Sequence, residues 1–259
     1  MLKYLYISNI SEVYFMKTFL KTICLILAVC SLLVISAACE QKSIDDKAYY
    51  DYISSNTGSG ENIRTKFVER EINSMKAEDF VSTDKESDYV LIKVQGYGEI
   101  VAVLRSDVAP VSVANFKKLI KAKFYDGTIF HRVIEDFMIQ GGGLTATPDA
   151  DGTGITYDEK PADTIFGEFS SNGFENNLYH IRGVLSMART SDKNSATSQF
   201  FIVHEVSAHL NGEYAAFGYV LAGMEVVDKI AECDEFIAPD SSMPMNDIII
   251  ESITFVEPK

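Results

Sequence analysis

Residues 88–257 are predicted to form a mainly β domain, a closed eight-stranded antiparallel barrel capped by two helices. Two observations support this fold class. This part of the chain contains about eight short apolar segments of strand length, and only two stretches show the periodicity of a helix. Closure into a barrel also removes the sheet edges along which β proteins tend to aggregate.

Strands are expected where short apolar runs alternate with turn residues. The first two runs, residues 89–95 and 99–104, flank Gly96 and Gly98, and this pattern is typical of a β-hairpin. The other strands are expected at residues 128–133, 137–140, 183–188, 199–203, 216–221 and 248–256.

Two helices are expected to cover the barrel. Pro110 opens the first, in which Val113, Phe116 and Ile120 share one face while lysines occupy the other. A single apolar face indicates that the helix has one buried side. The second, shorter helix is expected near residues 223–231.

The N-terminal region has the layout of a signal peptide. Two lysines precede an almost wholly apolar run at residues 23–35, which ends in small residues. Residues 36–39 read SAAC and resemble the lipobox of bacterial lipoproteins, whose cysteine is acylated and becomes the new N-terminus. Residues 1–38 are therefore predicted to be a signal peptide and Cys39 the lipidation site, so the mature protein is expected to be extracytoplasmic and anchored to the cell membrane as a lipoprotein.

A retained transmembrane helix over residues 18–38 is the alternative, because a bilayer span needs about 20 apolar residues. The small residues that run into Cys39 favour cleavage. Residues 39–87 are rich in polar and charged side chains and are predicted to be a lipid-anchored polar linker, with some helix around residues 67–80.

The charge balance of the chain excludes one class of partner. The sequence has 23 Lys and Arg residues against 37 Asp and Glu residues, which gives a formal net charge of −14. Nucleic-acid binding requires a basic face, so no nucleic-acid partner is expected. Beyond the signal region only Cys39 and Cys233 remain, and we expect Cys233 to be a small buried hydrophobic residue.

Three long segments carry the functional information. Residues 124–142 read FYDGTIFHRVIEDFMIQGG, residues 183–202 read GVLSMARTSDKNSATSQFFI, and residues 209–218 read HLNGEYAAFG. In this order they closely resemble the signature segments of the cyclophilins, a family of peptidyl-prolyl cis/trans isomerases. The resemblance covers about residues 88–256. It implies a cyclophilin-like barrel that accelerates rotation about X–Pro bonds in exported proteins and so assists their folding.

The resemblance also implies a role for each matched residue, with Arg132 as the catalytic arginine. The residues implied to bind substrate are Phe137, Met138, Phe201 and Leu210 in the proline pocket, Gln140 and Gln199 on the peptide backbone, the backbone of Ala188 and Arg189 at the residue before proline, and His209 and Tyr214 at the pocket rim.

The sequence departs from the best-known cyclophilins at several of these places. His209 stands where many members have tryptophan, and Tyr214 stands where many have histidine. Gly143 replaces a common aspartate, and residues 147–161 are expected to form an enlarged loop.

An arginine suits the chemistry that this resemblance implies. Amide resonance gives X–Pro rotation a barrier of about 18–20 kcal/mol, so a catalyst must stabilise a twisted amide. Twisting returns the lone pair to the prolyl nitrogen, and a fixed donor aimed at that nitrogen then bonds the transition state more strongly than the ground state. A guanidinium is always charged and holds its donors in a rigid fork.

The rival interpretation is a non-catalytic proline-peptide binding module on the cell surface, and a passive surface lipoprotein is a third. The retained Arg132 disfavours both, because holding a peptide requires no donor at the prolyl nitrogen. His131 and His180 are expected to be structural, and His204 with His209 lacks the spacing of a zinc site. We therefore expect no metal. We also expect no cofactor, and we expect a monomer whose clients are proline-containing polypeptides.

Overall fold

The structure is a computed structural model, and it describes residues 70–148, 155–233 and 241–259. The predicted signal peptide, Cys39 and most of the predicted linker lie outside these ranges. In the described part of the chain, no helix is both long enough and apolar enough to cross a membrane.

The first hairpin forms where the sequence predicts it. Strand β2 (Tyr89–Val94) pairs with β3 (Gly98–Leu104), and the N–H of Tyr97 donates to the carbonyl of Val94 at 3.1 Å to close the turn. Gly96 has a φ of 76°, a left-handed conformation that glycine adopts without steric cost.

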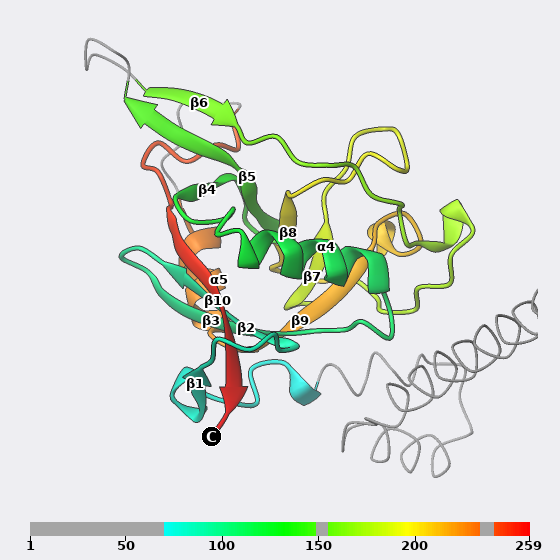
Figure 1. The fold of residues 1–259 in the computed structure, drawn as a ribbon. Coiled ribbons are helices and arrows are strands. Elements are labelled where there is room, and N and C mark those ends of the chain that lie inside the picture. The colour runs from blue at the N-terminus through cyan, green and yellow to red at the C-terminus, as the bar shows by residue number, and fades with distance from the viewer. Residues whose placement is uncertain (1–69, 149–154, 234–240) are drawn as a thin grey trace, which may run out of the picture. The chain divides into compact units, whose positions relative to one another are not determined.

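All strand pairs in the described part of the chain are antiparallel, as expected. They form one sheet in the order β1-β10-β2-β3-β9-β7-β8-β5-β4, with β6 paired to β5 (Figure 1). The remaining strands are β1 (Phe80–Ser82), β4 (Thr128–Ile134), β5 (Met138–Pro148), β6 (Ile155–Glu159), β7 (Val184–Met187), β8 (Phe200–Val203), β9 (Ala216–Ala222) and β10 (Ile250–Pro258).

The barrel closes between β4 and the start of β10. No continuous ladder joins these two strands in the sheet order. Instead, Ile129 forms an isolated bridge with Ile249, and the N–H groups of Gly127 and Phe130 donate to the carbonyls of Ile250 and Ile248, each at 2.9 Å. The eight strands from β10 round to β4 therefore make the predicted barrel, and β1 and β6 are additions to it.

The two predicted helices lie on this barrel. Helix α4 (Pro110–Lys121) packs against β9 and β10, and α5 (Met224–Ala231) packs against β3, β4 and β5. The described residues also contain the 3₁₀ helices η1 (Ala77–Asp79), η2 (Ser170–Asn172) and η3 (Ala208–Leu210).

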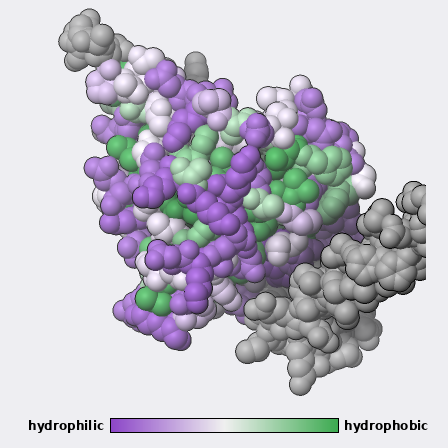
Figure 2. All heavy atoms as spheres, in the orientation of Figure 1, coloured by the Kyte–Doolittle hydropathy of each residue, from purple (hydrophilic) through white to green (hydrophobic). Residues whose placement is uncertain are grey.

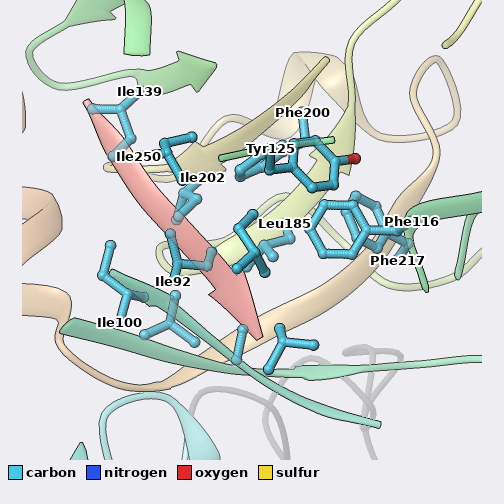
Figure 3. Packing of buried hydrophobic residues seen from close by; sticks show 14 of the residues in the cluster. Ile92, Ile100, Phe116, Tyr125, Ile139, Leu185, Phe200, Ile202, Phe217 and Ile250 are labelled. Carbon is cyan, nitrogen blue, oxygen red and sulfur yellow. The ribbon is translucent and has the colours of Figure 1, made fainter. Parts of the chain in front are cut away.

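The barrel interior holds a large hydrophobic cluster with an aromatic centre. Phe116, from α4, places its ring centroid 5.3 Å from Phe200 on β8 and 5.1 Å from Phe217 on β9 (Figure 3). Ile92 and Ile100 on the first hairpin are fully buried in the same cluster. Helix α4 is thus held to the barrel by aromatic contacts with central strands.

Strand alternation produces a second hydrophobic cluster on the other side of the wall. Ile139 and Phe200 belong to the interior cluster, whereas their neighbours Met138 and Phe201 belong to the second. Successive side chains of a strand point to opposite faces. The side chains that face away from the interior are therefore free to form the floor of a surface site.

Two segments differ from the expectation. Residues 147–161, expected to be an enlarged loop, continue β5 to Pro148 and return as β6, with Leu144 opposite Glu159 in the register. Figure 1 shows this hairpin extending away from the barrel. Most of its side chains are exposed, so it carries little of the apolar alternation from which a strand is recognised in a sequence.

The second difference concerns residues 70–87, which fall in the predicted linker. Ile72 packs against both hydrophobic clusters, and β1 pairs with β10. The Oδ1 of Asn73 accepts the N–H groups of Gly223 and Met224, at 3.1 and 3.3 Å, where α5 begins. From residue 70 onward this segment is therefore part of the folded domain.

The visible surface of the folded domain is mostly hydrophilic, with scattered hydrophobic residues (Figure 2).

Candidate active site

The site begins with two side chains that face each other across β4 and β5. Arg132 pairs in register with Gln140, and Arg132 Nη1 donates to Gln140 Oε1 at 3.4 Å. The same nitrogen lies 3.7 Å from the Sδ of Met138, and the guanidinium carbon lies 5.8 Å from the ring centre of Phe137. The β4–β5 pairing, which has a register irregularity between Phe130 and Arg132, and the turn that carries Phe137 thus gather the arginine and three of its predicted neighbours.

These side chains line a cavity of about 190 Å³. Every residue that lines it was predicted to belong to the site. The lining consists of Arg132, Phe137, Met138, Gln140, Arg189, Phe201, Leu210 and Tyr214.

The floor of the cavity is apolar. Met138, Phe201 and Leu210 are each at most 7% exposed, and they come from β5, β8 and η3. Tyr214 packs edge to face against Phe201, with ring centroids 5.9 Å apart. An apolar floor with few polar groups around it is typical of a small-ligand pocket.

The contacts of the Arg132 guanidinium leave part of it open to the cavity. In the described part of the chain its hydrogen bonds go to neutral acceptors, Gln140 Oε1 and Met138 Sδ, and it forms no ion pair with a carboxylate. Both contacts are long and both use Nη1. The other donors of the fork remain available to a ligand.

Three predicted residues lie beside the cavity and do not line it. Gln199 bonds Gln140, which donates its Nε2 to Gln199 Oε1 at 2.9 Å. The N–H of Ala188 donates to the carbonyl of Gln199 at 2.9 Å. His209 is exposed, and its ring centroid lies 5.4 Å from that of Phe137, so it covers the outer side of that wall.

The glycine at position 143 has a structural reason in this chain. A Cβ built there would lie 2.3 Å from the Cγ of Gln199, which is too close for an unmoved side chain. Gly143 therefore leaves the space in which Gln199 reaches Gln140.

Arg189 is fixed at the cavity by several contacts at once. Its guanidinium carbon lies 4.6 Å from the ring centre of Tyr214 and 5.1 Å from that of Phe169. Its Nε donates to the carbonyl of Glu213 at 3.0 Å, and its Nη1 donates to the carbonyl of Thr190 at 2.8 Å. The side chain of Arg189 thus shapes the cavity wall, in addition to the backbone role that the resemblance implies.

A buried polar group, His180, supports the floor, and its partners could not be predicted from the sequence. His180 stacks on Phe201 with ring centroids 5.9 Å apart. Its Nδ1 lies 3.1 Å from Asn211 Oδ1, and its Nε2 lies 2.9 Å from Ser186 Oγ. Burial lowers the pKa of His180 to about 4, although the bond to Asn211 partly opposes the shift. The expectation of a structural histidine agrees with this environment.

His131 also lies close to the site. Burial is the main cause that lowers its pKa, and contacts with the backbone of Ile129 and with Gln199 offset part of the effect. Among the residues that the structure describes, no three or more His, Cys, Asp or Glu side chains are grouped so that they could hold a metal ion.

Comparison with known proteins identifies this arrangement. The family described as "Cyclophilin type peptidyl-prolyl cis-trans isomerase/CLD" matches residues 89–255. The chain belongs to this family. Its activity is peptidyl-prolyl cis-trans isomerisation, and the matched range contains every residue of the cavity.

Individual cyclophilins agree with the assignment. The chain is 41% identical over 177 residues to peptidyl-prolyl cis-trans isomerase A of Dickeya dadantii. This match covers 66% of this chain and 86% of that protein. It is 45% identical over 139 residues to a peptidyl-prolyl cis-trans isomerase of Acinetobacter baylyi, over 52% and 67% of the two chains.

A solved structure shares the fold as well. The cyclophilin type isomerase of Cryptosporidium parvum, determined in the presence of the dipeptide Ala-Pro, is 32% identical with a TM-score of 0.52. The similarity covers 64% of this chain and 98% of that one.

Proposed function

We propose that this cyclophilin isomerises X–Pro bonds of exported proteins at the membrane surface, with Arg132 as the catalytic donor. Clients would bind with the proline ring on the floor made by Met138, Phe201 and Leu210. Gln140 and Gln199 would hold the peptide backbone, and the backbone of Ala188 and Arg189 would hold the residue before proline.

One observation carries this proposal. The guanidinium of Arg132 and the apolar floor line the same cavity of about 190 Å³, and the charge of the guanidinium is not paired there with a carboxylate of the described chain. A pocket that only held a proline ring would have no need of this donor.

The geometry suits catalysis by differential bonding. The apolar floor grips the pyrrolidine ring while the carbonyl side of the amide rotates, and the twisted amide exposes a lone pair on the prolyl nitrogen. A guanidinium already in place bonds that lone pair without reorganisation. Partial exclusion of water from the cavity strengthens the bond. No covalent bond forms or breaks, so the reaction needs neither metal nor cofactor.

The setting of the activity follows from the N-terminal sequence. Residues 1–38 resemble a signal peptide and Cys39 lies at the end of a lipobox-like segment. Acylation of Cys39 would tether the domain outside the cytoplasm, where newly exported proteins fold. X–Pro isomerisation takes tens to hundreds of seconds without a catalyst and can limit folding, so an isomerase at this place would act on clients before they aggregate.

A single experiment separates catalysis from mere peptide holding. NMR exchange spectroscopy on a peptide that contains Ala-Pro measures the cis/trans exchange rate with and without a catalytic amount of the protein. We expect strong acceleration, together with shifts of the peptide resonances on binding. Binding of the peptide with an unchanged exchange rate would contradict the proposal and would indicate a proline-peptide binding module.

A further inference from the structure

His204 holds the turn between β4 and β5 from outside the cavity. Its backbone N–H donates to the carbonyl of Phe137 at 2.9 Å, and its Nδ1 accepts the N–H of Asp136 at 3.0 Å. The last register pair of β5 and β8 is Met138 with Val203. The backbone bond of His204 therefore extends this ladder by one residue, and its imidazole adds a bond to the N–H of Asp136 in the turn.

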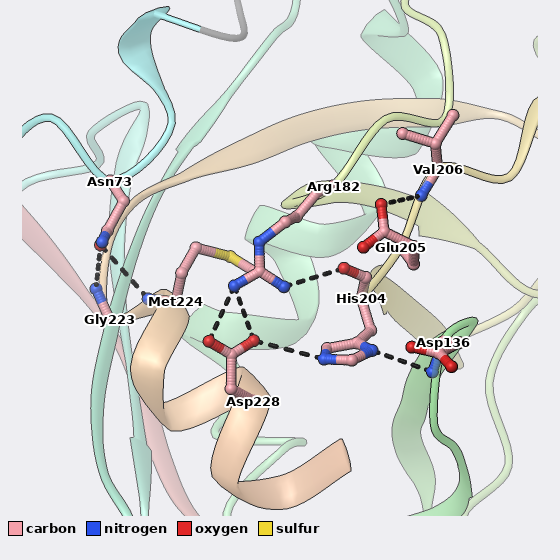
Figure 4. A network of polar contacts seen from close by, with 9 residues as sticks. All are labelled: Asn73, Asp136, Arg182, His204, Glu205, Val206, Gly223, Met224 and Asp228. Atoms are coloured by element: carbon pink, nitrogen blue, oxygen red, sulfur yellow. Dashed lines mark hydrogen bonds and ion pairs between the residues drawn. The ribbon is translucent and has the colours of Figure 1, made fainter. Parts of the chain in front are cut away.

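The other side of the imidazole meets helix α5. His204 Nε2 lies 3.3 Å from Asp228 Oδ1, and Arg182 holds the same carboxylate with its Nη2 at 2.7 Å. Arg182 Nη1 also donates to the carbonyl of His204 at 2.9 Å. Figure 4 shows the imidazole between the carboxylate of Asp228 and the backbone at Asp136.

These contacts determine where the proton of His204 lies. A backbone N–H can only donate, so Nδ1, which faces the N–H of Asp136, is the acceptor and carries no proton. The proton of the neutral ring is therefore on Nε2, which lies beside the carboxylate of Asp228 without a hydrogen bond to it. The side chain of His204 is only 12% exposed, so its ring is enclosed mainly by protein.

The bond from His204 fixes a turn with a left-handed residue. Asp136 has a φ of 55°, a conformation that Asp adopts more readily than most residues with a Cβ. Directly after it comes Phe137, which lines the cavity and contacts both Arg132 and His209. A shift of this turn would move one wall of the cavity.

We propose that His204 and Asp228 are positioning residues, which hold the β4–β5 turn so that Phe137 forms its wall of the proline pocket. This inference rests on the proposed function of the cavity. Because Phe137 packs against the proline ring in the ground state and in the transition state alike, loss of the positioning pair should act mainly on substrate affinity.

Two isosteric substitutions separate the two sides of the imidazole. In His204→Asn the side-chain oxygen can replace Nδ1 as the acceptor for Asp136, whereas in His204→Gln the amide nitrogen can take the place of Nε2 beside Asp228. His204→Leu removes both. Glu205→Gln is the matched control, because Glu205 is exposed and follows His204 directly in the chain. The glutamine keeps an acceptor oxygen for the N–H of Val206.

The measurement is the KM and kcat of X–Pro isomerisation by NMR on the full chain, together with thermal unfolding of each variant. We expect His204→Leu to raise KM by about tenfold, since a misplacement of about 1 Å in a site can cost up to a hundredfold. His204→Asn should recover most of this loss and His204→Gln little of it. The control should match the wild type.

A role in stability alone predicts a different result. Partial unfolding reduces the amount of active protein, which lowers the apparent kcat and leaves KM unchanged. An unchanged KM in folded His204→Leu, or recovery by Gln in place of Asn, would overturn the inference. Arg132→Ala in the same assay keeps the tests apart: if it has wild-type activity the proposed function fails, and if it is impaired while His204→Leu is not, only the positioning role fails.

Discussion

His180 shows how single buried residues support the pocket. Its ring lies against Phe201, and both ring nitrogens have partners in the neutral state, Asn211 and Ser186. The residue is 1% exposed, so a charge on it would have little solvation. The native pocket floor is therefore built on a neutral imidazole.

This environment predicts how stability depends on pH. Burial lowers the pKa of His180 to about 4, whereas a histidine in the unfolded chain titrates at about 6.5. Between these values the unfolded state binds more protons, so the contribution of His180 is complete above about pH 6.5 and is lost as the pH falls towards 4. The loss from this residue alone should be about 3 kcal/mol.

Urea unfolding of the wild type and of His180→Asn, repeated between these pH values, checks the prediction. The variant should lose most of the dependence on pH and keep a smaller part of the same sign, because burial also lowers the pKa of His131. A variant with the full wild-type slope would show that His180 is not the group responsible.

Most of the cavity could be predicted at the residue scale, because its residues lie in three contiguous motifs. Its support could not. His180 contacts Asn211, which lies 31 positions further along the chain. The packing of α5 brings Asp228 next to His204 and Arg182. A sequence gives residue types and spacing along the chain, but these pairings depend on how the strands close into a barrel.

At the scale of elements, helix α4 depends on a cap from a distant loop. No side chain at its N-cap, Ala109, forms a capping bond. Instead Glu168 accepts the N–H of Val111 and the N–H of Ser112, each at 2.8 Å, and the hydroxyl of Ser112 at 2.7 Å. Glu168 is fully buried, and a carboxylate at a helix N-terminus also interacts favourably with the helix dipole.

Removal of this cap should destabilise the whole domain. Glu168→Ala leaves the donors of Val111 and Ser112 without a partner, and we expect it to lower the free energy of unfolding by about 2–3 kcal/mol. Glu168→Gln should be milder, because the amide oxygen still accepts. Glu175→Gln, at an exposed carboxyl group, is the control for the loss of a charge. Equal urea midpoints for Glu168→Ala and this control would contradict the capping role.

The elements themselves were predicted to different degrees. The barrel strands and both helices lie close to their expected positions. The helices bury one face and so have an apolar period, whereas β7, β8 and β9 are buried at every position and appear as short apolar runs. Strands β1 and β6 were missed. β1 has three residues, of which only Phe80 is buried, and β6 has no buried side chain, so neither strand shows an apolar period in the sequence.

At the scale of the whole molecule, we propose that a lipid tether at Cys39 holds the isomerase domain at a membrane. The proposal rests on the lipobox-like segment that ends at Cys39. We expect Cys39→Ser to release the protein from membranes or to leave an unprocessed precursor. Membrane fractionation and intact mass of the native protein check this. An unmodified N-terminus that begins before Cys39 would contradict lipoprotein processing.

The central claim is that Arg132 stabilises the twisted amide, and its most direct test separates turnover from binding. NMR exchange gives the turnover of an X–Pro peptide and calorimetry gives its affinity, for wild type, Arg132→Ala and Arg132→Lys. Arg132→Ala should lose about two orders of magnitude in turnover, equivalent to about 2.7 kcal/mol, with a much smaller change in affinity. Arg132→Lys should recover only part, since an ammonium group lacks the fork of the guanidinium. A folded Arg132→Ala variant that isomerises the peptide at the wild-type rate would contradict the account.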